Sequence, residues 1–175
     1  MAEKLRLEDV IAAHWSAPRQ MAWYEGEWWT AERVFRPVGE NVKRLQAAGF
    51  GAGDRIVTML PNSPAFLALC MAAWKMRGPV TPLNTLAGPQ ALGALIKHSM
   101  PAVIVAAPAL KEHAEVLKGL PVPLVFLEAT GSLPEFKAVP SLKSSEDCCS
   151  IFYTSGTAGT PKGVPLTHMN ILTCL

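Results

Sequence analysis

"RIVTMLPNSPAFLALCMAAWKMRGPVTPL", Arg55 to Leu83, contains two short apolar runs separated by one helical pattern. "RIVTML" predicts a strand, and "PVTPL" predicts a second one. Between them, Ser63 is placed to cap a helix and Pro64 to occupy its first turn. Gly78 is expected to supply the left-handed residue that ends this helix. The stretch therefore predicts a strand–helix–strand unit.

The same alternation continues toward the C-terminus. Helical patterns cover residues 89–99, where Leu92, Leu95 and Ile96 recur at helical spacing, and residues 108–119. Further strands are expected in "AVIVAA", "VPLVFL" and "CCSIFY". Nearly all strand residues are apolar, as in parallel strands that are buried on both faces. We therefore predict an α/β fold with a mostly parallel sheet, right-handed crossovers and flanking helices. Residues 128–147, rich in Ser, Pro and charge, are expected to form a surface connection.

The N-terminal part is less regular. "MAWYEGEWWT" predicts a hairpin whose four aromatic side chains either pack across the strands or contact a ligand or membrane surface; cross-strand packing is the preferred interpretation. Residues 31–49 have helical spacing and end at Gly49. Pro37 should kink or delay that helix.

Composition excludes several classes of function. Sixteen Lys+Arg against fourteen Asp+Glu leave a net charge of +2, and without a run of basic residues a nucleic-acid partner is not expected. The longest apolar run, residues 65–74, is about half of what a transmembrane helix needs. The charged N-terminus is not a secretory signal, so we expect a cytoplasmic protein. Four cysteines without C-x-x-C spacing are expected to be reduced and mostly structural, and the sequence predicts no metal site.

Near the C-terminus, "YTSGTAGTPKG" follows the last predicted strand directly. Its glycines let successive backbone N–H groups turn toward one point, while hydroxyls and the ammonium of Lys162 add donors. Polyphosphate fits such a loop, which also lies where open α/β sheets bind ligands. A flexible Gly/Ser/Thr linker is the alternative from composition. A Walker-type loop is disfavoured, because Pro161 and Gly163 flank Lys162 where that motif needs Gly and Ser/Thr.

"YTSGTAGTPKGVPLTHMN" resembles the phosphate-loop signature of the adenylate-forming superfamily, which includes acyl-CoA synthetases, firefly-type luciferases and peptide-synthetase adenylation domains. Support extends upstream, from "WT" at Trp29 through "GD" at Gly53, and in "LPNSPAF" and "PVTPLN". The resemblance implies the N-terminal subdomain of the family's large domain. Residues 1–175 would then end just after the phosphate loop, without the rest of the large domain and without the C-terminal lid domain.

The resemblance also implies roles for individual residues. His168 is expected to hold the exit of the loop without transferring protons. Ala158 replaces a usual Thr and removes one hydroxyl donor, a loss of about 1 kcal/mol. The residues implied to wrap the β- and γ-phosphates of ATP are Thr154, Ser155, Gly156, Thr157, Ala158, Gly159, Thr160, Lys162 and Gly163.

The activity that the resemblance implies is an AMP-forming ligation: a carboxylate attacks ATP to give an acyl adenylate, and coenzyme A then displaces AMP. The magnesium ligand and the remaining catalytic groups would lie beyond Leu175, so we expect a truncated chain that is inactive alone. Hydrophobic carboxylates are the preferred substrate class. The alternatives are part of an adenylation domain that loads a carrier protein, and a non-catalytic nucleotide-binding or interaction module. An exposed sheet edge predicts self-association.

Overall fold

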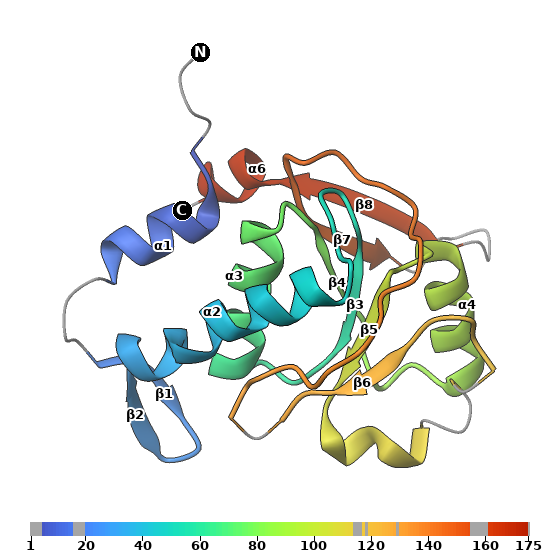
Figure 1. Cartoon of the computed structure of the whole chain (residues 1–175), viewed down its shortest axis with the longest axis horizontal. Coiled ribbons are helices and arrows are strands. Elements are labelled where there is room, and N and C mark those ends of the chain that lie inside the picture. The colour runs from blue at the N-terminus through green and yellow to red at the C-terminus, as the bar shows by residue number, and fades with distance from the viewer. Residues whose placement is uncertain are drawn as a thin grey trace.

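The computed structural model describes residues 5–15, 20–113, 117, 119–128, 130–154 and 161–174. Their elements are arranged as helices packed on both faces of a central sheet (Figure 1). The strands are β1 (Gln20–Tyr24), β2 (Glu27–Thr30), β3 (Ile56–Met59), β4 (Val80–Pro82), β5 (Val103–Ala106), β6 (Leu124–Phe126), β7 (Cys148–Thr154) and β8 (Lys162–Thr167). The helices are α1 (Leu7–His14), α2 (Ala31–Ala47), α3 (Pro64–Lys75), α4 (Pro89–Ser99), the 3₁₀ helix η1 (Pro108–His113) and α6 (His168–Leu172).

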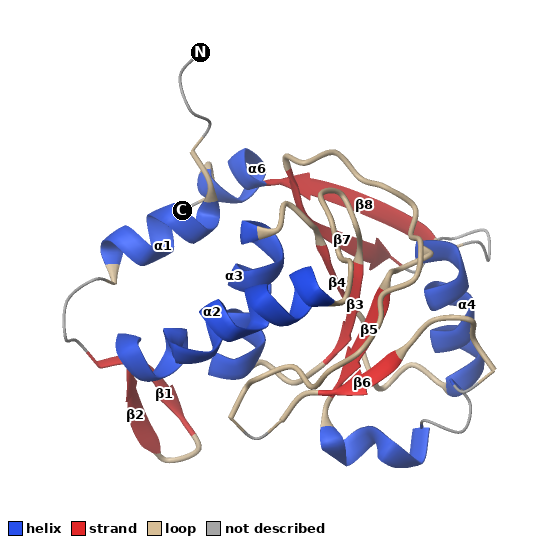
Figure 2. Cartoon of the chain, viewed as in Figure 1, coloured by secondary structure: helices blue, strands red, loops and turns tan. Residues whose placement is uncertain are grey.

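The main sheet has the strand order β6-β5-β3-β4-β7-β8. Every neighbouring pair is parallel except β7 and β8, which are antiparallel. This arrangement confirms the predicted α/β class, and Figure 2 shows the strands between the helical layers. The sequential strands β3 and β4 are neighbours, whereas β5 crosses to the other side of β3.

Alternation along the buried strands builds two cores. In β5, Val103 and Val105 point into the core on the α3 side, and Ile104 points to the core that contains Leu92 and Ile96 of α4. All four residues of β3 and of β5 are buried. The apolar runs read from the sequence therefore reflect burial on both faces of the sheet.

The N-terminal hairpin and its aromatic pairs are as predicted. Trp23 and Trp28 face each other edge to face with ring centroids 5.5 Å apart, and Tyr24 and Trp29 do so at 6.1 Å. Cross-strand packing is thus the use that the structure gives this cluster. Among the described residues, no helix is long and apolar enough to cross a membrane.

Two expectations about helix ends need correction, whereas the alternative of a kink at Pro37 stays a prediction. Helix α2 is not delayed by Pro37, since it begins at Ala31, where the Thr30 hydroxyl accepts from the Arg33 N–H at 3.3 Å. Helix α3 does carry its predicted Ser63 cap, but the left-handed residue after it is Arg77 (φ 57°) and not Gly78.

Gly78 is required for a different reason, namely close packing. A Cβ at this position would lie 2.5 Å from the carbonyl oxygen of Asp54 and 2.6 Å from the ring of Phe50. The glycine therefore lets the chain pass beside these two residues as it enters β4.

The connection of residues 128–147 is irregular, as predicted, but it is more than a surface segment. Ser132 and Leu133 are buried, and Asn41 of α2 holds the segment by accepting from the Leu133 N–H at 2.7 Å. Further along, the Ser144 N–H donates to the Gly53 carbonyl at 2.9 Å. The segment thus contributes to the core and packs against the sheet on its way to β7. Of the predicted helix at 108–119, the described part is η1, Leu117 and Gly119; residues 114–116 and 118 lie outside the described residues.

Candidate phosphate-loop site

The candidate site is built on the β7–β8 hairpin. Strand β7 leaves the core at its carboxyl end: its first four residues are buried, and Phe152 and Thr154 are exposed. Thr154 pairs directly with Lys162, and Tyr153 pairs with Gly163. The two ends of the predicted loop are therefore held side by side at the end of an antiparallel stem.

The structure places only the ends of the predicted loop. Ser155, Gly156, Thr157, Ala158, Gly159 and Thr160 lie outside the described residues. Thr154, Lys162 and Gly163 are exposed at the top of the stem, and Lys162 has no ion-pair partner among the described residues. An uncompensated ammonium at this position can attract an anionic ligand.

Packing within the stem explains the glycine at position 163. A Cβ there would meet Ile151 Cγ2 at 3.1 Å and the Tyr153 ring at 3.3 Å. The Tyr153 hydroxyl forms a hydrogen bond with Nδ1 of His98 at 2.9 Å, and their rings are 5.6 Å apart at an interplanar angle of 87°. Burial raises the pKa of Tyr153, so this hydroxyl stays neutral at physiological pH. The stem is thereby tied to helix α4.

His98 makes a contact with the stem that the sequence did not reveal. The scattered histidines are at no ligand spacing, and helical periodicity alone does not say which strand a side chain on α4 reaches. Only the sheet order, with β7 beside β4, brings His98 to Tyr153.

A hollow of about 530 Å³ opens beside the stem. Arg55, Lys143, His98 and Tyr153 contribute to its lining. Lys143 is held by Asp54, with Nζ 2.7 Å from Oδ1, and Arg55 donates to the Ser99 carbonyl at 3.0 Å. The charge of Lys143 is therefore compensated by Asp54, and Arg55 is the lining cation of this hollow that lies beside the stem without an ion pair among the described residues.

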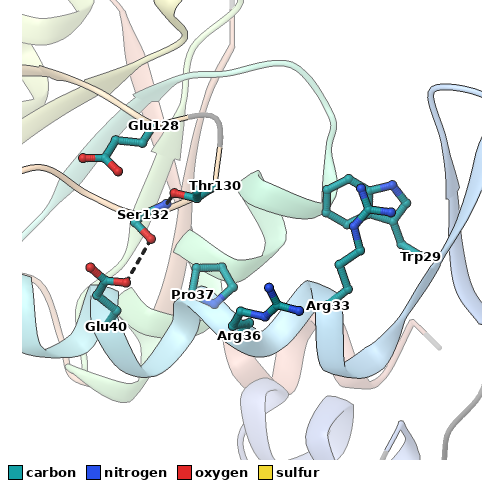
Figure 3. A pocket seen from close by; sticks show the side chains of 8 residues that line it. All are labelled: Trp29, Arg33, Arg36, Pro37, Glu40, Glu128, Thr130 and Ser132. Carbon is teal, nitrogen blue, oxygen red and sulfur yellow. Dashed lines mark hydrogen bonds between the residues drawn. The ribbon is translucent and has the colours of Figure 1, made fainter.

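A second hollow, of about 440 Å³, lies between the N-terminal hairpin, α2 and the 128–132 segment (Figure 3). Here the guanidinium of Arg33 stacks on Trp29 at 3.6 Å from the ring centroid. The two arginines of the lining, Arg33 and Arg36, are balanced by Glu40 and Glu128. A polyphosphate gains less here than at the loop, because the charges of this hollow cancel.

Beyond the loop, the chain turns into helix α6. The Thr167 hydroxyl accepts from the Asn170 N–H at 3.1 Å, and Asn170 Oδ1 accepts from the Thr167 N–H at 2.9 Å, which makes a reciprocal capping box. His168 begins this helix and is 3% exposed. Strand β8 separates it from the loop, so it lies at the base of the stem, and its expected role at the exit of the loop stays a prediction.

Comparison with known proteins agrees with this geometry. A model of the AMP-binding enzyme family matches residues 8–175. The chain belongs to the AMP-binding enzyme family. Its fold is accordingly that of the adenylate-forming enzymes, as the phosphate-loop resemblance implied.

Curated relatives of this chain include CoA ligases. It is 34% identical over 149 residues to a feruloyl-CoA synthase from Amycolatopsis, covering 81% of this chain and 29% of the relative. It is 31% identical over 136 residues to the long-chain-fatty-acid–CoA ligase FadD13 of Mycobacterium tuberculosis, covering 73% of this chain and 27% of the relative. The chain thus spans less than a third of either protein.

Solved structures show the same fold. ATP-bound MatB from Rhodopseudomonas palustris superposes with a TM-score of 0.71 at 23% identity, over 97% of this chain and 36% of MatB.

The described residues hold no group of three or more His, Cys, Asp or Glu side chains that could bind a metal ion. All four cysteines are free; three are buried and Cys174 is exposed, in agreement with the predicted structural thiols.

Proposed function

We propose that this chain is the phosphate-binding part of an ATP-dependent, AMP-forming carboxylate–CoA ligase. The observation that carries the proposal is the pairing of Thr154 with Lys162, which brings both ends of the Gly/Ser/Thr loop together at the end of one stem. Membership of the AMP-binding family and the CoA ligases among the relatives support the reaction class. The carboxylate would be hydrophobic, and ATP would be the nucleotide substrate.

In this proposal the chain supplies charge and position. The loop N–H groups and hydroxyls surround the β- and γ-phosphates, and the ammonium of Lys162 reduces the charge of the departing pyrophosphate. Two unit charges 4 Å apart interact by about 4 kcal/mol at an effective dielectric constant of 20. Mg²⁺ would accompany ATP, and the proposal assigns no magnesium ligand to the described residues.

The test is binding of ATP to the 175-residue chain by calorimetry, compared with Lys162→Gln. Loss of a charge-assisted contact of about 1.5–3 kcal/mol should weaken binding about ten- to a hundredfold. Lys43→Gln, on the exposed side of α2, is the matched control and should bind as the parent does. Equal affinities of the parent and Lys162→Gln would contradict the proposal.

Two further measurements separate the parts of the proposal. Ala158→Thr restores the hydroxyl that the family's signature usually has, and should raise ATP affinity about fivefold, which corresponds to about 1 kcal/mol. We expect no carboxylate-dependent exchange of pyrophosphate into ATP by the chain alone. Exchange activity would show that the 175 residues are a complete catalyst and would overturn the expectation that they are inactive alone.

A further inference from the structure

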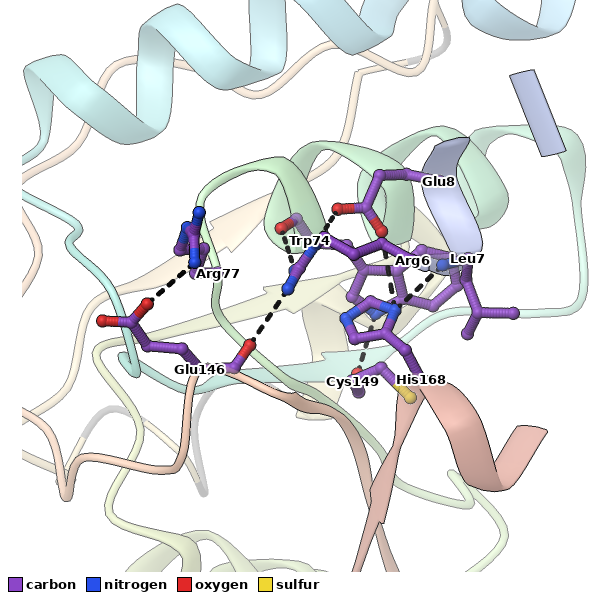
Figure 4. Close-up of polar contacts among 8 residues, drawn as sticks. All are labelled: Arg6, Leu7, Glu8, Trp74, Arg77, Glu146, Cys149 and His168. Atoms are coloured by element: carbon purple, nitrogen blue, oxygen red, sulfur yellow. Dashed lines mark hydrogen bonds and ion pairs between the residues drawn. The ribbon is translucent and has the colours of Figure 1, made fainter. Parts of the chain in front are cut away.

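The start of helix α1 contacts the base of the β7–β8 stem, at the end opposite the loop, across almost the whole length of the sequence (Figure 4). The backbone N–H of Leu7 donates to Nδ1 of His168 at 3.1 Å. His168 is the first residue of α6 and follows the last residue of β8 directly. We call Arg6, Leu7 and Glu8 the N-terminal turn.

Arg6 connects this turn to two other parts of the molecule. Its Nε lies 2.6 Å from Oε1 of Glu8, its Nη2 donates to the Trp74 carbonyl at 2.8 Å, and its Nη1 donates to the Glu146 carbonyl at 3.2 Å. The turn is thus joined to the last part of α3 and to the segment that enters β7. Glu8 and His168 are each 3% exposed, so this is a buried cluster and not a surface ion pair.

Trp74 connects the same cluster to strand β7. Its ring lies edge to face against His168, with centroids 5.9 Å apart, and its Nε1 donates to the Cys149 carbonyl at 2.8 Å. Strand β7 is held through Cys149, and strand β8 through His168. Both strands of the stem are therefore anchored at the end opposite the loop.

The backbone N–H of Leu7 defines the protonation state and the tautomer of His168. Because Nδ1 accepts from a backbone N–H, the ring is neutral and carries its proton on Nε2. Nε2 is buried and has no hydrogen-bond partner among the described residues. Only one of the two ring nitrogens, Nδ1, therefore carries the connection to the N-terminal turn.

We propose that Arg6 and His168 are positioning residues for the phosphate loop, acting through the N-terminal turn and the β7–β8 stem. Loss of the Leu7–His168 hydrogen bond separates the carboxyl end of β8 from the N-terminal turn and leaves it held by β7 and by the His168 N–H, which donates to the Asp147 carbonyl at 3.1 Å. The paired positions Thr154 and Lys162 then sample more than one alignment. The effect on ATP binding rests on the proposed function, whereas the effect on the stem does not.

The experiment replaces the two nitrogens of His168 separately. His168→Asn places an amide oxygen near the position of Nδ1 and keeps an acceptor for Leu7. His168→Gln places its polar group near the position of Nε2, which has no partner. Amide hydrogen exchange is measured without nucleotide in β8, and in β3 and β5 as internal references.

We expect His168→Asn to exchange in β8 within about twofold of the parent and His168→Gln to exchange at least tenfold faster, with β3 and β5 unchanged. Arg6→Ala should resemble His168→Gln. Arg77→Ala is the control, because Arg77 pairs with Glu146 at 3.0 Å on the surface and does not contact the N-terminal turn. If His168→Gln does not fold, the comparison of Arg6→Ala with Arg77→Ala decides the question in the same way.

Equal exchange rates of the β8 amides in His168→Asn and His168→Gln would overturn the proposal. Faster exchange of the β3 and β5 amides by the same factor as in β8 would also overturn it, because His168 would then act on global stability. ATP affinity is measured on the same variants and should fall severalfold in His168→Gln but not in His168→Asn. If the parent chain binds no ATP, the proposed function fails, while the exchange data still test the anchoring of the stem.

Discussion

The packing of Gly163 against Tyr153 yields a prediction that tests the stem directly. In Gly163→Ala the new Cβ would lie 3.1 Å from Ile151 Cγ2 and 3.3–3.4 Å from Cζ and the hydroxyl of Tyr153. The tyrosine cannot move away freely, because its hydroxyl is bonded to His98 at 2.9 Å. We therefore expect the substitution to destabilise the protein, although alanine restricts the unfolded chain more than glycine does.

The magnitude follows from two opposing effects. Overpacking in a well-packed site costs about 1–3 kcal/mol, and replacing glycine by alanine at a backbone conformation that alanine can adopt recovers about 0.4–1 kcal/mol. The net loss should be about 1–2 kcal/mol. For a chain of this size it corresponds to a fall in Tm of about 2–8 °C.

Urea unfolding followed by circular dichroism measures this loss, and Gly93→Ala provides the matched control. Gly93 lies inside α4 with no atom within 4 Å of an added Cβ. The same chemical change should there stabilise the helix by up to about 1 kcal/mol. If Gly163→Ala were as stable as Gly93→Ala, the argument that Tyr153 is held rigidly between the stem and α4 would be refuted.

Three further predictions concern other parts of the chain. Burial and the neighbouring Arg6 lower the pKa of His168 below its usual 6.5, so the unfolded chain binds a proton more tightly than the folded chain does. The contribution of His168 to the free energy of unfolding should therefore be complete above pH 6.5 and decrease as the pH falls below it. A His168→Asn variant with the same pH dependence as the parent would contradict this. Gly53→Ala should lower the free energy of unfolding in urea by about 2–5 kcal/mol, because φ is +77° and the new Cβ would lie 2.6 Å from the Ser144 carbonyl oxygen. A decrease of less than about 0.5 kcal/mol would contradict this prediction. Burial raises the pKa of Cys149 to about 11, so at pH 8 a maleimide should label the exposed Cys174 rapidly and Cys149 hardly at all. Intact-mass spectrometry of the labelled parent and of the labelled Cys174→Ser variant measures this difference. Equal labelling of both thiols would contradict the prediction.

The parallel part of the fold could be predicted because local sequence and tertiary environment agree there. Strands β3 and β5 are buried on both faces, so their apolar runs identify them without knowledge of their neighbours. The Ser63 cap is equally local, since its hydroxyl accepts from a backbone N–H three residues away. The end of the same helix was predicted less well, because the need for glycine at Gly78 comes from Phe50 and Asp54, which are distant in sequence.

The candidate site likewise has a part that local sequence predicts and a part that depends on residues distant in sequence. Its local part, the apolar strand that leads directly into the glycine-rich stretch, could be predicted from residues that follow one another in the chain. The resemblance to the adenylate-forming signature assigned the residues of this stretch, and these stay predictions. What could not be predicted is how the stem is held, because His98 and Arg6 reach it only through the strand order and through the return of α6 to α1.

The two anchors of the stem also differ in chemical character. At the loop end, the Tyr153 hydroxyl bonds to a histidine whose side chain is exposed, so breaking this contact costs less than breaking a buried one. At the opposite end, the Leu7 N–H and Nδ1 of His168 are buried, and breaking their bond leaves both groups without water. The stem is therefore held at both ends, and the anchor at its base costs more to break than the anchor near the loop.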